Sequence, residues 1–158
     1  QESAVSALMR RGVRLGVDVG KARVGVARSD PDGLLAVPVE TLPRAEALDK
    51  LVALSADYDA LEIIVGLPIS LRGTDTASTT DAREFAVQLA QEVSVPVRLV
   101  DERLSTVSAQ QMLSGGGTEA RKQRQIIDQA SAVIILQHSL DQERRTGAAP
   151  GAQVNEGE

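Results

Sequence analysis

Three carboxylates occupy positions in the sequence where hydrophobic side chains would be expected. Asp18 interrupts the alternating run RLGVDV, Glu102 closes the run VRLVDE, and Asp128 opens the mostly apolar stretch IDQASAVIIL. A carboxylate in apolar surroundings is costly unless it is paired, protonated or bound to a cation. Converging carboxylates repel one another unless a divalent cation lies between them, and such a cluster can hold two ions that promote phosphodiester hydrolysis.

Each of these acids also has an ordinary structural role open to it. Asp18 could be a turn residue ahead of Gly20, and Glu102 could pair with Arg103 or Arg98. Asp128 could cap its helix or form an ion pair near Arg124. Spacing alone therefore leaves two possibilities open, a convergent acidic site or three unrelated structural acids.

Composition limits what kind of metal the chain could bind. It has 158 residues, no cysteine and a single histidine, His138. Disulfides, iron–sulfur clusters, thiolate zinc sites and histidine-rich metal sites are therefore excluded. A metal would have to be held by carboxylates and water, which favours Mg²⁺ or Mn²⁺.

Length and hydropathy predict one globular domain. With 42% hydrophobic residues the chain can bury a real core, which we place at residues 13–143. Residues 1–12 and 144–158 are small, polar or rich in Gly and Pro, and we expect them to be flexible tails. No apolar run is long enough to cross a membrane and the N-terminal stretch lacks a secretory pattern, so we expect a cytoplasmic protein.

Hydrophobic periodicity predicts a mixed α/β architecture. Alternation favours strands, and recurrence every three or four residues favours helices. The predicted strands are 14–19, 23–28, 34–42, 61–68 and 95–102, and the predicted helices are 44–57, 79–93, 108–113 and 124–143. This order is a three-strand antiparallel meander followed by two parallel strands, a five-stranded mixed sheet flanked by helices. Pro38 predicts an edge or a bulge in the third strand.

The elements would bring the acids together if the last helix lies close to the sheet. Parallel strands end at a common edge, where ligand sites gather. Small residues after Asp128 (Ala130, Ser131 and Ala132) would let that helix approach the sheet and direct its carboxylate to this edge. Successive strand residues point oppositely, so Asp101 should face away from Glu102.

Four motifs in fixed order resemble those of the YqgF/RuvX family, bacterial proteins with a ribonuclease H-like fold. They are DVGKARVGVA, IIVGLP followed by RGTD, DERLSTVSA and IDQASAVIIL, and the resemblance covers about residues 13 to 141. It implies a three-layer ribonuclease H-like domain. It also implies that Asp18, Glu102 and Asp128 are the catalytic residues and hold Mg²⁺ or Mn²⁺, as two ions.

The family is described both as Holliday-junction resolvase-like and as a nuclease for the 5′ end of pre-16S ribosomal RNA. The resemblance thus implies a hydrolase, a divalent-metal-dependent endonuclease acting on structured RNA in ribosome biogenesis or on branched DNA in recombination and repair. Water activated by the ions would attack the phosphorus. Phosphate contacts would come from Lys21, Arg23, Arg103, Arg121, Lys122 and Arg124. The last three residues fall in a predicted glycine-rich loop, 114–125. This loop could instead be a flexible connection with no role in binding phosphate.

Two other classes of function stay open on sequence alone. A DxG strand followed by a hairpin also occurs in actin-like and sugar-kinase ATPases, although those enclose a nucleotide between two domains and this chain has room for one. A non-catalytic nucleic-acid-binding module would keep the fold and cleave nothing. The choice between RNA and DNA, and between monomer and homodimer, is not fixed by any residue pattern.

Overall fold

The structure, a computed structural model, describes residues 9–69, 73–102 and 120–154, with side chains in the last helix from Gln129 onward. The predicted helix at 108–113 lies outside these residues. In chain order the elements are β1 (Arg14–Val19), β2 (Arg23–Ser29), β3 (Ala36–Pro43), α2 (Arg44–Asp57), β4 (Glu62–Leu67), α3 (Ala77–Glu92), β5 (Val97–Asp101), α5 (Ala120–Thr146) and β6 (Ala152–Gln153).

The strands form one six-stranded sheet in the order β3-β2-β1-β4-β5-β6. β1, β2 and β3 make the predicted antiparallel meander, and β4 and β5 join it in parallel to β1. The sixth strand, β6, pairs antiparallel with β5 and was not predicted. Because β1, β4 and β5 are parallel, their carboxyl ends lie at the same edge of the sheet.

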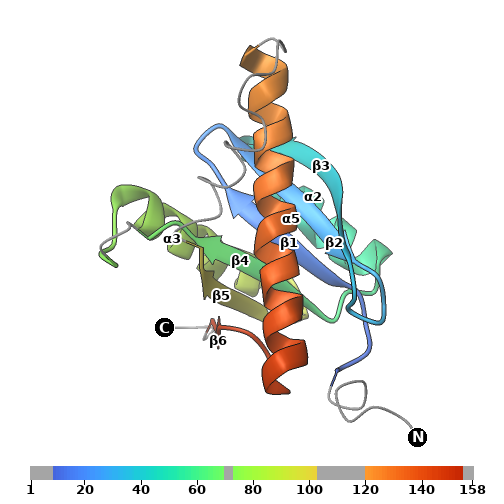
Figure 1. Ribbon diagram of the computed structural model, residues 1–158. Coiled ribbons are helices and arrows are strands. Elements are labelled where there is room, and N and C mark those ends of the chain that lie inside the picture. Colours follow the sequence, from blue (N-terminus) through green and yellow to red (C-terminus); the bar gives the residue numbers. More distant parts are fainter. Residues whose placement is uncertain (1–8, 70–72, 103–119, 155–158) are drawn as a thin grey trace, which may run out of the picture.

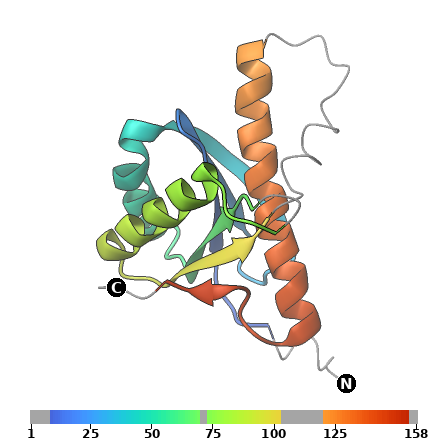
Figure 2. The same ribbon diagram turned by 90° about the vertical axis from the view of Figure 1, so that its left-hand side faces the viewer.

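The helices cover both faces of the sheet and make three layers. α2 and α3 lie on one face, and α5 crosses the other face (Figures 1 and 2). In both views the first turns of α5 project beyond the sheet. None of the helices within the described ranges is long and apolar enough to cross a membrane.

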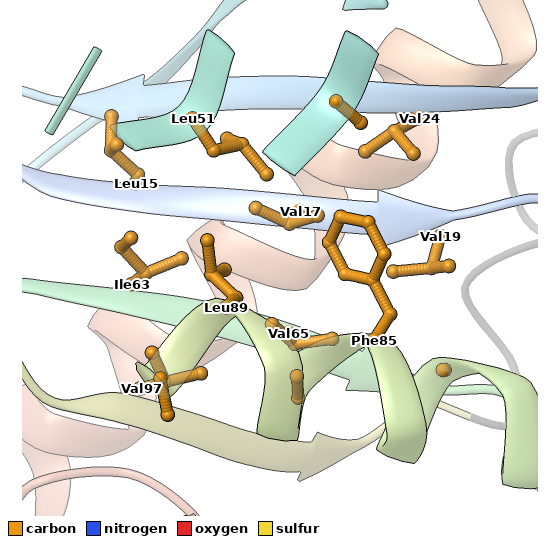
Figure 3. Packing of buried hydrophobic residues seen from close by; sticks show 14 of the residues in the cluster. Leu15, Val17, Val19, Val24, Leu51, Ile63, Val65, Phe85, Leu89 and Val97 are labelled. Carbon is orange, nitrogen blue, oxygen red and sulfur yellow. The ribbon is translucent and has the colours of Figure 1, made fainter. Parts of the chain in front are cut away.

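The main core lies between the sheet and the α2/α3 layer. Leu15, Val17 and Val19 alternate along β1 toward this core, and Phe85 and Leu89 of α3 cover them (Figure 3). Full burial of a side chain of this size contributes about 1.5–3 kcal/mol. Since β1 uses every second residue for this core, its other residues face α5.

On the opposite face, α5 approaches β1 very closely. A Cβ atom added to Gly16 would lie 2.7 Å from Cβ of Leu136 and 3.0 Å from the carbonyl oxygen of Ala132. The close approach predicted from the small residues of the helix is therefore present at Ala132. It also requires a glycine in the strand, which the sequence analysis did not assign.

The third strand has the features that Pro38 predicts. β3 is an edge strand, and its register with β2 shifts between Val26, opposite Glu40, and Ala27, opposite Pro38. Proline lacks an N–H to donate to a neighbouring strand, so an edge position with a bulge accommodates it. The prediction of an edge or bulge is confirmed.

Both ends of α5 differ from the sequence-based expectation. The helix begins at Ala120 rather than at the predicted residue 124, so residues 120–123 are helical and the predicted basic loop is wrong there. It continues to Thr146, and β6 follows with Val154 buried and its N–H donating to the carbonyl oxygen of Val97 at 2.8 Å. Residues 144–154 therefore do not form the flexible tail predicted from their composition.

A buried ion cluster joins the amino ends of β1, β4 and β5 to the end of α5. The Arg10 guanidinium contacts Glu62 and Glu143, each at 2.8 Å. Arg14 contacts Glu143 at 3.2 Å, and Arg98 contacts Glu62 at 3.0 Å. Arg10, which the sequence analysis placed in a flexible tail, is thus held against the domain.

Candidate active site

The side chain of Asp18 lies on the α5 face of the sheet, because successive side chains of β1 point to opposite faces. Its neighbours Val17 and Val19 are buried in the opposite core, whereas Gly16 lies under α5. Asp18 itself is half-buried and is paired in register with Gly25 of β2. Asp18 is therefore a strand residue, and the alternative of a turn residue is wrong.

Glu102 follows β5 and lies on the same face as Asp18. Its N–H donates to the carbonyl oxygen of Leu67 at 3.0 Å, which extends the pairing with β4 by one residue. Its side chain is only 9% exposed. Asp101, the preceding residue, is exposed, as strand alternation predicts. Arg98 contacts Glu62 instead, so the alternative that Arg98 neutralises Glu102 has no support.

Asp18 and Glu102 line the same pocket at the carboxyl ends of the strands. The pocket has a volume of about 390 Å³ and is lined by Asp18, Val19, Pro68, Ile69, Thr76, Ser78 and Glu102. Burial, together with the negative charges of Asp101 and Asp18, raises the pKa of Glu102 to about 8. The site therefore brings two carboxyl groups together in partly dehydrated surroundings, where the ionised form of Glu102 is disfavoured.

Contacts along α5 fix the direction in which this helix crosses the sheet. Gln129 donates to Thr41 near the end of β3, and Gln137 accepts from the N–H of Ala36 at its start. α5 therefore runs antiparallel to β3, and hence to β1. The turn that contains residue 128 lies toward the carboxyl end of β1, where Asp18 is. The side chain of Asp128 lies outside the described residues.

Of the three predicted metal-binding acids, the structure describes the side chains of two, Asp18 and Glu102. Within residues whose side chains the structure describes, no group of three Asp, Glu, His or Cys residues could hold a metal ion. The third acid that the sequence predicts, Asp128, has its side chain outside these residues.

The predicted phosphate-binding residues fall into two groups. Lys21 is exposed in the β1–β2 hairpin, and Arg23 is half-buried at the start of β2, so both follow Asp18 closely. Arg121, Lys122 and Arg124 lie in the first turns of α5, and the structure does not describe their side chains. Arg103 lies outside the described residues altogether.

Several residues around the pocket were not predicted from the sequence. Thr76 and Ser78, at the start of α3, also line it, and the Thr76 side chain caps the helix by accepting from the N–H of Thr79 at 3.2 Å. His138 is 62% exposed, and its Nδ1 lies 3.7 Å from Oε1 of Glu102. The Ser/Thr-rich stretch before α3 was a helix-start signal, but nothing in the sequence linked His138 to Glu102.

A second pocket also includes Glu102 in its lining. It has a volume of about 380 Å³ and is lined by Leu99, Val100, Asp101, Glu102, His138, Ser139, Gln142, Gly151 and Ala152. Glu102 therefore forms part of the wall of both pockets.

The fold is shared with solved structures of RuvC. The RuvC structure of Thermus thermophilus matches with a TM-score of 0.54 at 18% identity, covering 90% of this chain and 99% of that one. T. thermophilus RuvC in complex with a Holliday junction substrate matches with a TM-score of 0.57 at 16% identity. The architecture is therefore ribonuclease H-like, as the resemblance predicted.

Sequence relatives give a narrower assignment. A protein of Clavibacter michiganensis subsp. michiganensis is 57% identical over 150 residues, 92% of this chain and 93% of its own length. One from Nocardioides sp. is 54% identical over 155 residues, 94% of this chain and 99% of its own. Both carry the name "Putative pre-16S rRNA nuclease". The family described as "RuvX: Holliday junction resolvase" matches residues 12–142, and the chain belongs to this family. The assignment supports a hydrolytic nuclease and gives no support to the ATPase alternative.

Proposed function

We propose that this chain is a divalent-metal-dependent endonuclease that processes the 5′ end of pre-16S ribosomal RNA in the cytoplasm. Asp18, Glu102 and Asp128 would hold the metal. The observation that carries the proposal is that Asp18 and Glu102 line one pocket at the carboxyl ends of β1 and β5. More than half of the residues are identical in the Clavibacter relative whose name specifies a pre-16S rRNA nuclease, which supports the choice of substrate.

The chemistry of the pocket fits a hard divalent cation. Burial and the negative charges of Asp101 and Asp18 raise the pKa of Glu102, and a cation between Asp18 and Glu102 would relieve the repulsion between these two carboxylates. Carboxylate oxygens are the ligands that Mg²⁺ and Mn²⁺ prefer. When bound, a pair of such ions would lower the pKa of the attacking water and would stabilise negative charge on the phosphate and on the leaving oxygen.

The chain's own side chains would bind and orient the nucleic acid. Lys21 is exposed in the hairpin that follows Asp18, and we propose that it and Arg23 contact phosphates beside the pocket. The first turns of α5 project beyond the sheet (Figures 1 and 2). They carry Arg121, Lys122 and Arg124. We propose that these three residues, and Arg103, bind phosphates in a flanking part of the substrate. Such contacts hold the backbone without reading bases.

A second candidate function is resolution of Holliday junctions, which the description of the matching family favours. Junction resolution needs two cuts related by symmetry and would therefore favour a homodimer. Trimming one RNA end needs a single site and is possible for a monomer. Single-turnover cleavage of a precursor-rRNA fragment and of a four-way DNA junction, with the solution mass measured in parallel, distinguishes the two. We expect the RNA to be cut faster; faster cleavage of the junction by a dimer would favour the second candidate.

Metal binding is tested by calorimetric titration with Mn²⁺. We expect Asp18→Asn, Glu102→Gln and Asp128→Asn each to weaken binding by at least about tenfold, because each removes one anionic ligand. Asp141→Asn is the matched control, since Asp141 lies on α5 and is exposed in an ion pair with Arg144. Parental Mn²⁺ affinity in all three variants would refute the site, and cleavage of neither substrate by the parent would favour a non-catalytic module.

A further inference from the structure

Arg44, the first residue of α2, joins three separate parts of the chain. Its Nη1 donates to the carbonyl oxygen of Gly20 at 2.8 Å and to Oδ2 of Asp81 at 2.9 Å. Its Nη2 donates to Oδ1 of Asp81 at 3.0 Å, which completes a bidentate pair. The guanidinium also lies over the ring of Phe85, 5.1 Å from its centroid. The planar guanidinium thus connects the β1–β2 hairpin to α3.

The hairpin is held at a second point by the backbone of the same residue. The N–H of Arg44 donates to the carbonyl oxygen of Ala22 at 2.9 Å, and the N–H of Gly20 donates to that of Arg23 at 2.9 Å. A Cβ on Gly20 would lie 2.7 Å from the Arg23 oxygen, so the turn is tight enough to need glycine. Arg44 therefore binds carbonyl oxygens on both sides of Lys21.

These contacts connect two parts of the wall of the pocket that contains the acids. Asp18 forms one part, and Gly20 follows it by two residues. Thr76 forms another part of the wall, and Asp81 lies in the helix that Thr76 caps. A side chain that binds Gly20 and Asp81 together fixes how far apart these parts stand.

The electrostatics of Asp81 agree with this arrangement. Hydrogen bonds from Arg44 lower the pKa of Asp81, and the positive charges of Arg44 and Lys21 lower it further. Lys21 therefore lies within electrostatic reach of the same carboxylate. Since the guanidinium already donates to Gly20 and Asp81, its geometry suits holding the hairpin rather than binding a substrate phosphate directly.

We propose that Arg44 is a positioning residue of the nuclease site, clamped by Asp81, which holds the β1–β2 hairpin against α3 so that Asp18 and Lys21 meet the scissile phosphate in a fixed geometry. The proposal rests on the proposed nuclease function and adds residues that act through the hairpin. Arg44 and Asp81 touch neither the metal nor the substrate in this account.

The first test is steady-state cleavage by Arg44→Lys and Asp81→Asn. We expect kcat to fall at least about tenfold with KM changed less than about threefold, because misplacement by an ångström is costly in rate and lost positioning affects the transition state. Lysine keeps the charge but cannot bridge Gly20 and Asp81 together. The control is Asp75→Asn, which breaks the exposed Arg83–Asp75 ion pair and should leave kcat unchanged.

A direct phosphate contact by Arg44 gives the opposite pattern. Arg44→Lys would then keep most of its activity, Asp81→Asn would lose none, and Arg44→Ala would mainly raise KM. Any of these results would overturn the proposal. Thermal unfolding of each variant separates a change in rate from a loss of folded protein.

The second test does not depend on nuclease activity. Amide hydrogen exchange of residues 19–23 should be faster in Arg44→Lys and Asp81→Asn than in the parent, and unchanged in Asp75→Asn. Parental protection in both variants would overturn the clamp even if the enzyme is active. A parent that cleaves no nucleic acid, with faster exchange in the variants, would instead refute the proposed function and leave the clamp supported.

Discussion

Gly66 lies directly beneath the side chain of Glu102. A Cβ atom on residue 66 would stand 3.1 Å from Cγ of Glu102 and 2.5 Å from Cδ1 of Ile135. Gly66 belongs to β4, which separates β1 from β5. The missing side chain therefore provides space on the α5 face for Glu102 to share a pocket with Asp18, and lets α5 pack closely above it.

Gly66→Ala should therefore damage the fold and the site together. We expect the free energy of unfolding to fall by about 1–3 kcal/mol, because a methyl group in this packed position forces its neighbours to move. We also expect Mn²⁺ affinity to fall, since Glu102 must shift. Urea unfolding and calorimetric titration measure the two effects.

The double variant Gly66→Ala/Ile135→Val separates these two effects. Removing the Cδ1 atom of Ile135 relieves the closest contact, so part of the stability should return. The crowding of Glu102 remains, so Mn²⁺ affinity should stay low. Full recovery of metal affinity in the double variant would show that Gly66 serves helix packing alone.

The pKa of Glu102 predicts an unusual dependence of stability on pH. Its value in the folded protein, about 8, is above the usual 4.5, so folding favours the protonated carboxyl group. For the metal-free protein, this contribution is complete below about pH 4.5 and is lost as the pH rises through about 8. Glu102→Gln should therefore be more stable than the parent at pH 9, by about 1–3 kcal/mol.

Urea unfolding with EDTA present, at pH 6 and pH 9, measures this effect. The difference between Glu102→Gln and the parent should grow with pH, because glutamine carries no charge to bury. Added Mn²⁺ should reverse the order at pH 9 by binding the parent's carboxylate. A constant difference at both pH values would show that Glu102 does not titrate in this range.

The buried ion cluster at the amino ends of the strands should be essential for stability and irrelevant to metal binding. Glu62→Gln leaves Arg10 and Arg98 without their shared carboxylate, and breaking a buried pair costs about 3–5 kcal/mol. Asp32→Asn breaks the exposed Arg11–Asp32 pair and should cost less than about 1 kcal/mol. Urea unfolding gives both values, and equal losses would contradict this ranking.

Binding of nucleic acid should depend on Lys21 through its charge. In a Glu102→Gln background, which prevents cleavage, Lys21→Ala should weaken RNA binding and reduce the slope of log K against log salt by about one. Lys50→Ala is the matched control, because Lys50 is exposed on α2. Fluorescence anisotropy at several salt concentrations measures both slopes. Equal slopes for the two variants would show that Lys21 does not contact the nucleic acid.

The sequence predicted the elements wherever a simple period governs burial. The bounds of β1 and α2 agree with the predicted 14–19 and 44–57, because their apolar residues repeat at strand and helix spacing. The start of α5 was predicted as a loop because glycines precede it. Arg121, Lys122 and Gln123 nevertheless favour helix, and their polarity gave no periodic signal.

Long-range pairs are what the sequence could not predict. Arg44 and Asp81 are 37 positions apart and neither belongs to a motif, so only the fold shows that they meet beside the hairpin. Strand β6 has two residues, too few for any period. The convergence of Asp18 and Glu102 followed from strand order, whereas the space that Gly66 leaves for Glu102 required the packing of α5.

The most direct test of the account is single-turnover cleavage of a precursor-16S rRNA fragment with Mn²⁺. Asp18→Asn and Glu102→Gln should each cut at least about 1,000-fold more slowly than the parent, because residues of one catalytic unit are each needed for the chemical step. Asp141→Asn should cut at the parental rate. Parental cleavage by either site variant, in a folded protein, would contradict the assignment of Asp18 and Glu102 as the catalytic centre.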